Sequence, residues 1–317
     1  MKLQLVNEII DCMPKERTVF RYFKDRYALM LLGYLADKDI SRVSDIKKST
    51  FSGLLDKPFV KNNILKLSNG KLSKDLINYL WPDFTHDYVL TVSKWNYEDT
   101  SWGQTSRKGF NLVLQLNFSS QHDRFYKKLV KPEYEQLLNY WAHPIYEQKD
   151  REYFRETLAW ARIDLDFSTN EALIEEIQSD WVRRAKRLYR NALWHRKRKY
   201  KKVRNWDVLG NVESVISYYE DHLIPYEKVW AETMLAATIE FIRDEIGITN
   251  IHYHSAKTGA KVKRISYAEP PVSLYEKLPK RFCFNKIAEA PDFLQADKGF
   301  RRLYKKVRDP AWFKLAV

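Results

Sequence analysis

The stretch EALIEEIQSDWVRRA, residues 171–185, decides how the rest of the chain is interpreted. It begins as an apolar strand around Leu173, changes to polar residues, and is followed by arginines directly after Trp181. Because alternate residues of a strand share a face, we expect a row of polar side chains at its end. On this pattern Ile174, Glu176, Gln178 and Asp180 lie on one face, and Leu173, Glu175, Ile177 and Ser179 lie on the other.

This polar row has two interpretations. A buried carboxylate is costly unless it is paired or faces water, so the strand either ends in solvent or ends at a functional site. In the second case a carboxylate at the strand end serves as a general base or binds a cationic substrate. We expect the residues Gln178, Ser179, Asp180 and Trp181 to contact that substrate.

The hydrophobic pattern around this stretch predicts an α+β fold, with a mixed, mostly antiparallel central sheet and flanking helices. Two pairs of segments alternate with a period of two, which is typical of antiparallel strands. The predicted elements are strands at residues 87–97, 110–118, 157–167 and 172–181, a helix at 225–247, a strand at 248–255, and a helix from 270 that leads into a final strand.

The first 82 residues predict a helical region that precedes the sheet. Residues 21–39 have the spacing of an amphipathic helix, and shorter helical pieces follow between polar turns. A small winged-helix-like unit would fit this pattern. Residues 83–317 then form the α+β domain, with a basic helical insert at residues 182–225.

The composition indicates a globular, strongly basic protein. The 317 residues are 44% hydrophobic and carry a formal net charge of +14, which favours a polyanionic partner. No apolar run is long enough to span a membrane, and the N-terminus does not resemble a secretory signal. Cys12 and Cys283 form no disulfide framework, so we expect a reducing cytoplasm. His252 and His254 have no acidic residue or cysteine nearby in the sequence, and we predict no metal site.

A basic segment at residues 183–204 is the strongest indication of a partner. Lys or Arg occupies 12 of its 22 positions, interleaved with aromatic residues. Such a segment is either a solvated helix face or a surface for nucleic acid, here RNA or single-stranded DNA, in which cations neutralise phosphates and aromatic rings stack on bases. The candidate nucleic-acid-binding residues are Arg190, Trp194, Arg196, Lys197, Arg198, Lys199, Tyr200, Lys201, Lys202 and Arg204.

The heptad EEIQSDW, residues 175–181, resembles the signature of domains found in large polyproteins of phages and mobile genetic elements. In those domains a strand ending in this heptad is followed by a helix, a strand and a second helix with a pattern similar to SLYEKLPKRF, residues 273–282. The resemblance covers roughly residues 150–295. It implies a phage or mobile-element origin and carries little information about chemistry.

A more distant resemblance bears on mechanism. The order hairpin, strand, helix, strand, helix, strand and the sequence LYEKLPKRF, residues 274–282, are similar to the GNAT family of N-acyltransferases. This resemblance implies a GNAT-like fold and acetyl-CoA or another acyl-CoA as cofactor. It also implies that Tyr275 protonates the departing thiolate, and that Glu175 or Glu176 takes the proton from the substrate amine.

The chain departs from that family where the cofactor binds. GNAT enzymes hold the pyrophosphate with Q/R-x-x-G-x-G/A at a helix N-terminus, whereas QSDWVRRAKR, residues 178–187, contains no glycine. Pro279 also replaces the glycine of the family's LYEKLGF ending. Side chains are then the candidates for holding a pyrophosphate: Arg183, Arg184, Lys186 and Arg187.

Two functions follow from these observations. The first is an N-acyltransferase that acts on an amine on or near a nucleic acid. The second is a non-catalytic nucleic-acid-binding protein that reuses the fold and binds no cofactor.

Overall fold

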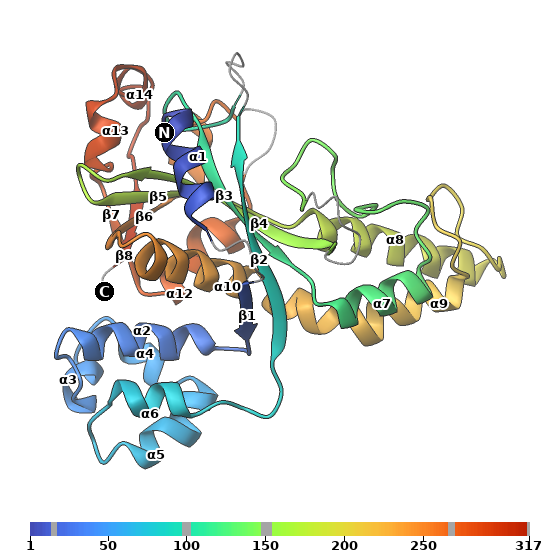
Figure 1. Ribbon diagram of the computed structural model, residues 1–317, viewed down its shortest axis with the longest axis horizontal. Helices are drawn as coiled ribbons and strands as arrows, with labels where there is room; N and C mark the ends of the chain where they lie inside the picture. Colours follow the sequence, from blue (N-terminus) through green and yellow to red (C-terminus); the bar gives the residue numbers. More distant parts are fainter. Residues whose placement is uncertain (14–17, 97–102, 147–153, 266–269, 316–317) are drawn as a thin grey trace.

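An eight-stranded mixed sheet forms the centre of the protein in the computed structural model, which describes residues 1–13, 18–96, 103–146, 154–265 and 270–315 (Figure 1). The strands are β1 (Thr18–Tyr22), β2 (His86–Trp95), β3 (Asn111–Asn117), β4 (Thr157–Asp166), β5 (Glu171–Gln178), β6 (Asn250–His254), β7 (Phe284–Ile287) and β8 (Trp312–Leu315). Their order is β1-β2-β3-β4-β5-β6-β8-β7. Neighbouring described strands are antiparallel except β5 and β6, which are parallel. The predicted α+β class with a mixed, mostly antiparallel sheet is confirmed.

Helices surround this sheet. They are α1 (Leu3–Cys12), α2 (Arg26–Asp37), α3 (Val43–Lys47), α4 (Ser52–Leu55), α5 (Leu65–Leu67), α6 (Lys74–Tyr79), α7 (Ser120–Leu129), α8 (Asp180–Lys197), α9 (Val212–Ser217), α10 (Ile224–Glu240), α11 (Ala256–Val262), α12 (Leu278–Arg281), α13 (Asp292–Ala296) and α14 (Lys298–Tyr304). Segments of π-helix are η1 (Val60–Ile64), η2 (Tyr218–Leu223), η3 (Phe241–Glu245) and η4 (Ser273–Lys277). Among the helices that the structure describes, none has both the length and the apolar character needed to cross a membrane.

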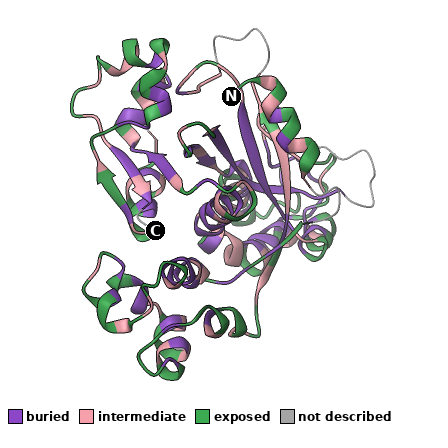
Figure 2. Ribbon diagram, turned by 60° about the vertical axis from the view of Figure 1, so that its left-hand side comes forward, coloured by how far each residue is buried: buried purple, intermediate pink, exposed green. Residues whose placement is uncertain are grey.

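The helices form separate groups around the sheet (Figure 1). α2 to α6 make a unit at one end of the molecule, whereas α7, α8 and α9 form a helical projection beyond the sheet. The strands at the centre are largely buried, while the α2–α6 unit has exposed outer faces (Figure 2). The projection therefore extends the basic segment away from the core.

Two short strands differ from the sequence-based prediction. Most elements of the first 82 residues are helices, but β1 lies among them and pairs with β2 at the edge of the sheet. β8 comes from the basic tail and inserts between β6 and β7. Trp312 and Phe313 of β8 are fully buried, so the tail contributes to the core.

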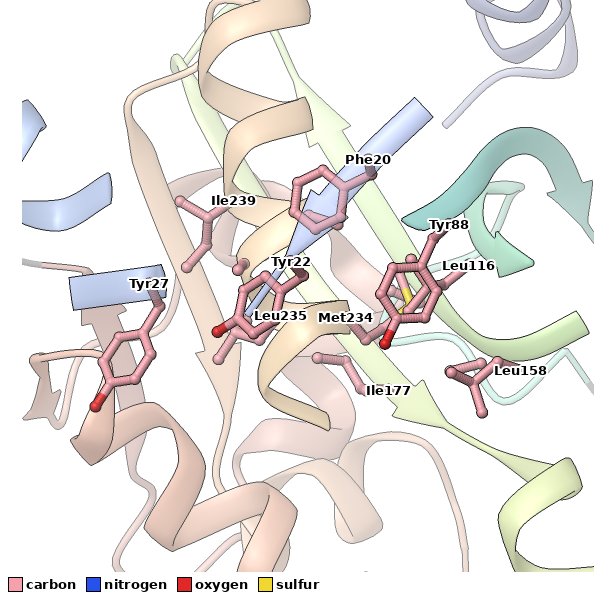
Figure 3. Close-up of a cluster of buried hydrophobic side chains, with 14 of the residues drawn as sticks. Phe20, Tyr22, Tyr27, Tyr88, Leu116, Leu158, Ile177, Met234, Leu235 and Ile239 are labelled. Atoms are coloured by element: carbon pink, nitrogen blue, oxygen red, sulfur yellow. The ribbon is translucent and has the colours of Figure 1, made fainter. Parts of the chain in front are cut away.

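The main core lies between the sheet and α10 (Figure 3). Met234, Leu235 and Ile239 of α10 are fully buried there, and each large apolar side chain contributes about 1.5–3 kcal/mol by its burial. Because α2 packs on the other side of α10, this helix is apolar around most of its circumference. The strand residues of this core that Figure 3 labels are Phe20, Tyr22, Tyr88, Leu116, Leu158 and Ile177.

A β-bulge interrupts β5 at Glu175. Arg162 of β4 pairs with Glu176 of β5, and the next residue, Ile163, pairs with Ile174. Glu175 therefore has no residue opposite it. Such an extra residue changes which side chains point to each face of the strand beyond it.

The bulge corrects the predicted placement of the polar row. Ile174 and Ile177 both belong to the main core, although a regular strand would point them to opposite faces. Glu176 lies opposite Arg162, and Gln178 opposite Trp160, on the other face of the sheet. The predicted grouping of Ile174 with the polar row is wrong, because simple alternation assumes an uninterrupted pairing.

Candidate functional site

The polar row meets a buried arginine on the sheet face opposite α10. Arg162 forms an ion pair with Glu176 and donates to the carbonyl oxygens of Gly103, at 2.9 Å, and Gln104, at 3.1 Å. Its guanidinium lies 4.7 Å from the ring centroid of Trp95. The side chain of Glu176 is only slightly exposed. Arg162 therefore joins β4, β5 and the loop after β2 into one polar cluster.

The charges around Glu176 keep it ionised. Burial alone opposes ionisation, but the positive charges of Arg162 and Lys263 outweigh it and lower the pKa of Glu176. A carboxylate with a lowered pKa is a weaker proton acceptor. Of the two glutamates predicted as bases, this one has the more accessible side chain.

Glu175 is fully buried, and both of its carboxylate oxygens accept hydrogen bonds. Ser106 donates from its backbone N–H, at 2.8 Å, and from its hydroxyl, at 2.9 Å, while Nε2 of His254 lies 3.0 Å away. Burial opposes ionisation, but the hydrogen bond and charge of His254, with the charges of Lys263 and Arg162, hold the pKa of Glu175 at about 2. This geometry fits a residue that fixes the loop around Ser106 to the sheet.

Strands β5 and β6 separate at the bulge, and a lysine fills the gap. Their parallel pairing ends at Ile174 and Tyr253. Nζ of Lys263, which follows α11, donates to the backbone oxygen of Glu175 at 2.8 Å. The backbone position that parallel pairing would otherwise use is therefore taken by this side chain.

Tyr275 lies beside this gap, in the interior. Its ring centroid is 5.6 Å from that of Tyr253, and Nζ of Lys263 is 5.9 Å from the Tyr275 ring. Burial, with the nearby charge of Glu176, raises the pKa of Tyr275 well above its usual value. The fold thus brings the predicted acid and bases into one region, but buries Tyr275 there.

The remaining polar residues of the row join a histidine from a distant loop. The carboxylate of Asp180 is 1% exposed, and its Oδ2 lies 2.6 Å from Nδ1 of His143, whose side chain is 28% exposed. The other oxygen of Asp180 accepts from Gln178, at 2.7 Å, and from Arg183, at 2.5 Å. A carboxylate oxygen can only accept, so this contact places the proton on Nδ1 and leaves Nε2 as the basic nitrogen of His143. The amide nitrogen of Gln178 also lies 3.1 Å from Nδ1.

Aromatic rings surround this histidine. Trp95 and Trp160 stack with centroids 6.0 Å apart, and His143 meets the edge of Trp160 at 5.5 Å. Tyr140 lies 5.5 Å from His143, and the adjacent Trp141 is 91% exposed. We refer to this cluster as the strand-end site; it comprises Trp95, His143, Trp160, Arg162, Glu176, Gln178 and Asp180.

Ser179 and Trp181 have structural surroundings. The Ser179 hydroxyl accepts from the N–H of Val182 at 3.1 Å, and it donates to the backbone oxygen of Leu158 at 2.6 Å. It thereby caps α8 directly after β5. Trp181 is fully buried and donates from its indole N–H to the Tyr218 hydroxyl at 3.0 Å. Neither side chain belongs to the strand-end site.

α8 carries a line of cations away from that site. Positions three or four apart share a helix face, and the line from residue 183 to residue 197 is about 21 Å long. Among the described residues, Arg187, Arg190 and Lys197 have no ion-pair partner, whereas Arg183 pairs with Asp180. We call this line the basic stripe; it comprises Arg183, Arg187, Arg190, Trp194 and Lys197, all exposed.

Other predicted cations lie beside the stripe. Lys186 pairs with Glu227 at 2.9 Å. Arg184 is half-buried, with its guanidinium 5.1 Å from the ring centroid of Tyr140 and 5.8 Å from that of Trp206. Of the four residues predicted to hold a pyrophosphate, Arg187 is thus the one without an ion pair or ring contact among the described residues.

The stripe ends in an aromatic tip, which we define as residues 194–204. Trp194 and Tyr200 are 46% and 39% exposed, with ring centroids 6.3 Å apart. The guanidinium of Arg198 lies 3.7 Å from the Trp194 ring, and that of Arg204 lies 4.7 Å from the Tyr200 ring. The other predicted nucleic-acid contacts of the tip are also exposed: Arg196, Lys197, Lys199, Lys201 and Lys202.

Comparisons with protein-family models, with curated proteins and with solved structures found no match to this chain. The interpretation of both sites therefore depends on their own geometry.

Proposed function

We propose that this protein binds single-stranded nucleic acid along the basic stripe and the aromatic tip. The observation that carries this proposal is the line of exposed cations on α8, of which Arg187, Arg190 and Lys197 have no ion-pair partner among the described residues. Surface cations paired with carboxylates offer little to a ligand, whereas unpaired ones release counterions when they neutralise phosphates.

The aromatic tip favours single strands over a duplex. Trp194 and Tyr200 are partly exposed although each carries an arginine over its ring. Stacking of a base on such a ring contributes about 1–3 kcal/mol and needs an unpaired base. In a duplex the bases are paired and stacked on one another, so they cannot stack on these rings.

Fluorescence anisotropy with labelled single-stranded RNA and DNA, measured over a series of salt concentrations, tests this function. If five phosphates are neutralised, log K falls against log salt with a slope of about −3.5. Trp194→Ala weakens binding by about 1–3 kcal/mol at constant salt. Binding that is independent of salt, or that prefers duplex DNA, would contradict the proposal.

We propose N-acyl transfer to an amine on or near a nucleic acid as a second candidate. Its support is the separation of the parallel strands β5 and β6 beside Glu176 and Tyr275, the residues that the GNAT resemblance implies as base and acid. Two features oppose a bound acyl-CoA. Lys263 occupies the gap, and the carboxylate of Asp180 lies in the first turn of α8, where a pyrophosphate would need positive charge.

Calorimetric titration with acetyl-CoA at about 300 mM salt distinguishes the two candidates, because weak surface binding of polyphosphates is screened there. Saturable binding that exceeds the binding of ADP supports an acyltransferase. If the heats of acetyl-CoA titration equal those of ADP titration, the result supports a nucleic-acid-binding protein that binds no cofactor. The rate of acyl transfer by the Glu176→Gln variant then shows whether the activity depends on that carboxylate.

The cellular setting is also a proposal. Cys12 and Cys283 are both free thiols, which fits a reducing compartment such as the cytoplasm. The EEIQSDW resemblance supports a phage or mobile-element origin.

A further inference from the structure

We propose that His143 and Asp180 form a general-base pair that takes the proton from a 2′-hydroxyl of RNA bound along the basic stripe. The pair would make the protein an RNA-cleaving enzyme. This inference rests on the proposed function, because the stripe has to deliver the strand to the pair. It concerns the strand-end site alone and needs no acyl donor.

The pair has the geometry of an oriented base. Asp180 is buried and holds Nδ1 of His143 at 2.6 Å, whereas the imidazole is partly exposed. The carboxylate fixes the tautomer, leaves Nε2 as acceptor and stabilises the positive ring that forms when Nε2 takes a proton. Gln178 and Arg183 hold the carboxylate in turn, so that it cannot rotate away.

The stripe leads to this pair. Asp180 and Arg183 are one helical turn apart at the start of α8, and Arg183 is also the first cation of the stripe. The guanidinium groups of Arg183 and Arg184 lie 5.3 Å and 5.1 Å from the ring centroid of Tyr140, which itself contacts His143. A strand that follows the stripe from the tip therefore brings a phosphate close to the imidazole.

The other parts of the site suit a ribonucleotide. Trp141, beside Tyr140, is almost fully exposed and can stack on a base. Arg184, together with the N–H groups of Arg183 that do not bond Asp180, can stabilise the charge that develops on a phosphate under attack. The two glutamates are less suitable as bases, because Glu175 is buried and Glu176 has a lowered pKa from its pairing with Arg162, which outweighs its burial.

The reaction is an internal transfer and needs no co-reactant other than water. The 2′-oxygen attacks the adjacent phosphorus as its proton passes to Nε2 of His143. The bond between phosphorus and the 5′-oxygen breaks, and the 5′-oxygen takes a proton from water. The imidazolium then returns its proton to the hydroxide. The products are a 2′,3′-cyclic phosphate and a 5′-hydroxyl end.

The test uses the full chain and DNA oligonucleotides that contain one ribonucleotide. We expect cleavage only after the ribonucleotide, with a 2′,3′-cyclic phosphate identified by mass spectrometry. His143→Gln should reduce the rate by about 100-fold or more while the affinity for the oligonucleotide stays unchanged. His222→Gln, purified in parallel, is the matched control, because His222 is half-buried, stacks on Phe125 at 4.1 Å and lies outside the site.

Asp180 acts through His143, so its test includes the tautomer of the ring. Nitrogen NMR of the wild-type protein near pH 8 should show His143 with its proton on Nδ1, and Asp180→Asn should weaken that preference together with the rate. A protein that binds RNA and leaves it intact, or that cleaves equally well after His143→Gln, overturns this inference alone. A protein that binds neither single-stranded RNA nor single-stranded DNA overturns the proposed function as well.

Discussion

Burial and neighbouring charge decide what each acidic side chain of this sheet can do. Glu175 is completely enclosed, yet its hydrogen bonds and the cations around it keep its pKa at about 2. Glu156, just before β4, is equally buried, and one of its carboxylate oxygens has no hydrogen-bond partner among the described residues. Burial, followed by the charge of Asp123, raises the pKa of Glu156 to about 8. The pKa of a buried glutamate in this protein is thus lowered or raised according to the charges and hydrogen bonds around it.

Glu156 predicts a pH dependence of stability. Its pKa is raised in the folded state, so the unfolded chain loses this proton first and stability falls as the pH rises from about 4.5 to 8. Glu156→Gln removes this titration. The loss of unfolding free energy between pH 5 and pH 8, measured with urea, should therefore shrink by roughly 3 kcal/mol. Glu133→Gln, an exposed change nearby, serves as control, and an equal effect there would refute the assignment.

Trp181 should behave as a core residue, although the sequence suggested a contact with substrate. Its indole is fully buried and hydrogen-bonded to Tyr218. Trp181→Ala should lower the unfolding free energy by about 3–5 kcal/mol, since it leaves a cavity and removes the indole hydrogen bond to the Tyr218 hydroxyl, which keeps only its contact with Nε2 of His122. Denaturation with urea measures this loss. A cost below about 1 kcal/mol would show that the ring is not part of the core.

At the scale of elements, α8 combines a buried beginning with an exposed length. Ser179 fixes its first turn to β4 and Trp181 is buried in the core, and α8 then continues into the projection beyond the sheet (Figure 1). A helix anchored in this way holds its cations in a fixed line. That rigidity reduces the entropy lost on binding a strand.

The stripe predicts additive electrostatic losses. Arg187→Gln and Arg190→Gln should each make the salt slope of single-strand binding shallower by about 0.7, whatever the base sequence. Lys186→Gln is the matched control on the same helix, because Lys186 is already paired with Glu227. Anisotropy titrations over a salt series provide the slopes. Equal changes for all three variants would argue against a defined line of contacts.

The sequence predicts the regular elements better than the irregular ones. Period-two alternation finds β2 to β5, and the basic composition finds the surface of α8. The bulge at Glu175 leaves no signal of its own, because an inserted residue resembles any other until its partner strand is known. β1 and β8 are missed because β1 lies in a region whose spacing predicts helices, and β8 ends a tail whose basic composition hides its few apolar positions.

At the scale of the molecule, one buried glutamate links several elements. Glu232 of α10 accepts hydrogen bonds from the Tyr22 hydroxyl of β1 and the backbone N–H of Asp25, both at 2.6 Å. Its other oxygen pairs with Arg281 of α12. The α2–α6 unit also contacts the end of this helical run through Tyr34, which donates to Asp244 at 2.8 Å. These contacts bind the N-terminal unit to the core.

Glu232→Ala should therefore weaken the whole fold. Removing the carboxylate leaves the buried Tyr22 hydroxyl without its acceptor, which costs about 1–3 kcal/mol, and the partly exposed Arg281 adds less. We expect one cooperative transition at lower urea concentration, observed equally by circular dichroism and tryptophan fluorescence. Two separated transitions would show that the α2–α6 unit unfolds independently.

The strand-end site shows the limit of prediction from a single sequence. Gln178 and Asp180 stand out as polar residues after an apolar strand, but His143 lies 35 residues before Gln178, in a loop without a pattern. Only the folded sheet brings that loop to the beginning of α8. Long-range contacts of this kind depend on tertiary packing, which local periodicity does not encode.

The most direct test of nucleic-acid binding along α8 is photo-cross-linking with single-stranded RNA that contains 4-thiouridine at successive positions. Mass spectrometry of the cross-linked peptides should place one end of the strand at the tip, on Trp194 or Tyr200, and the other end near Tyr140 and Trp141. Intermediate positions should cross-link to the stripe. Cross-links confined to other surfaces, or scattered without order along the strand, would contradict a path along α8.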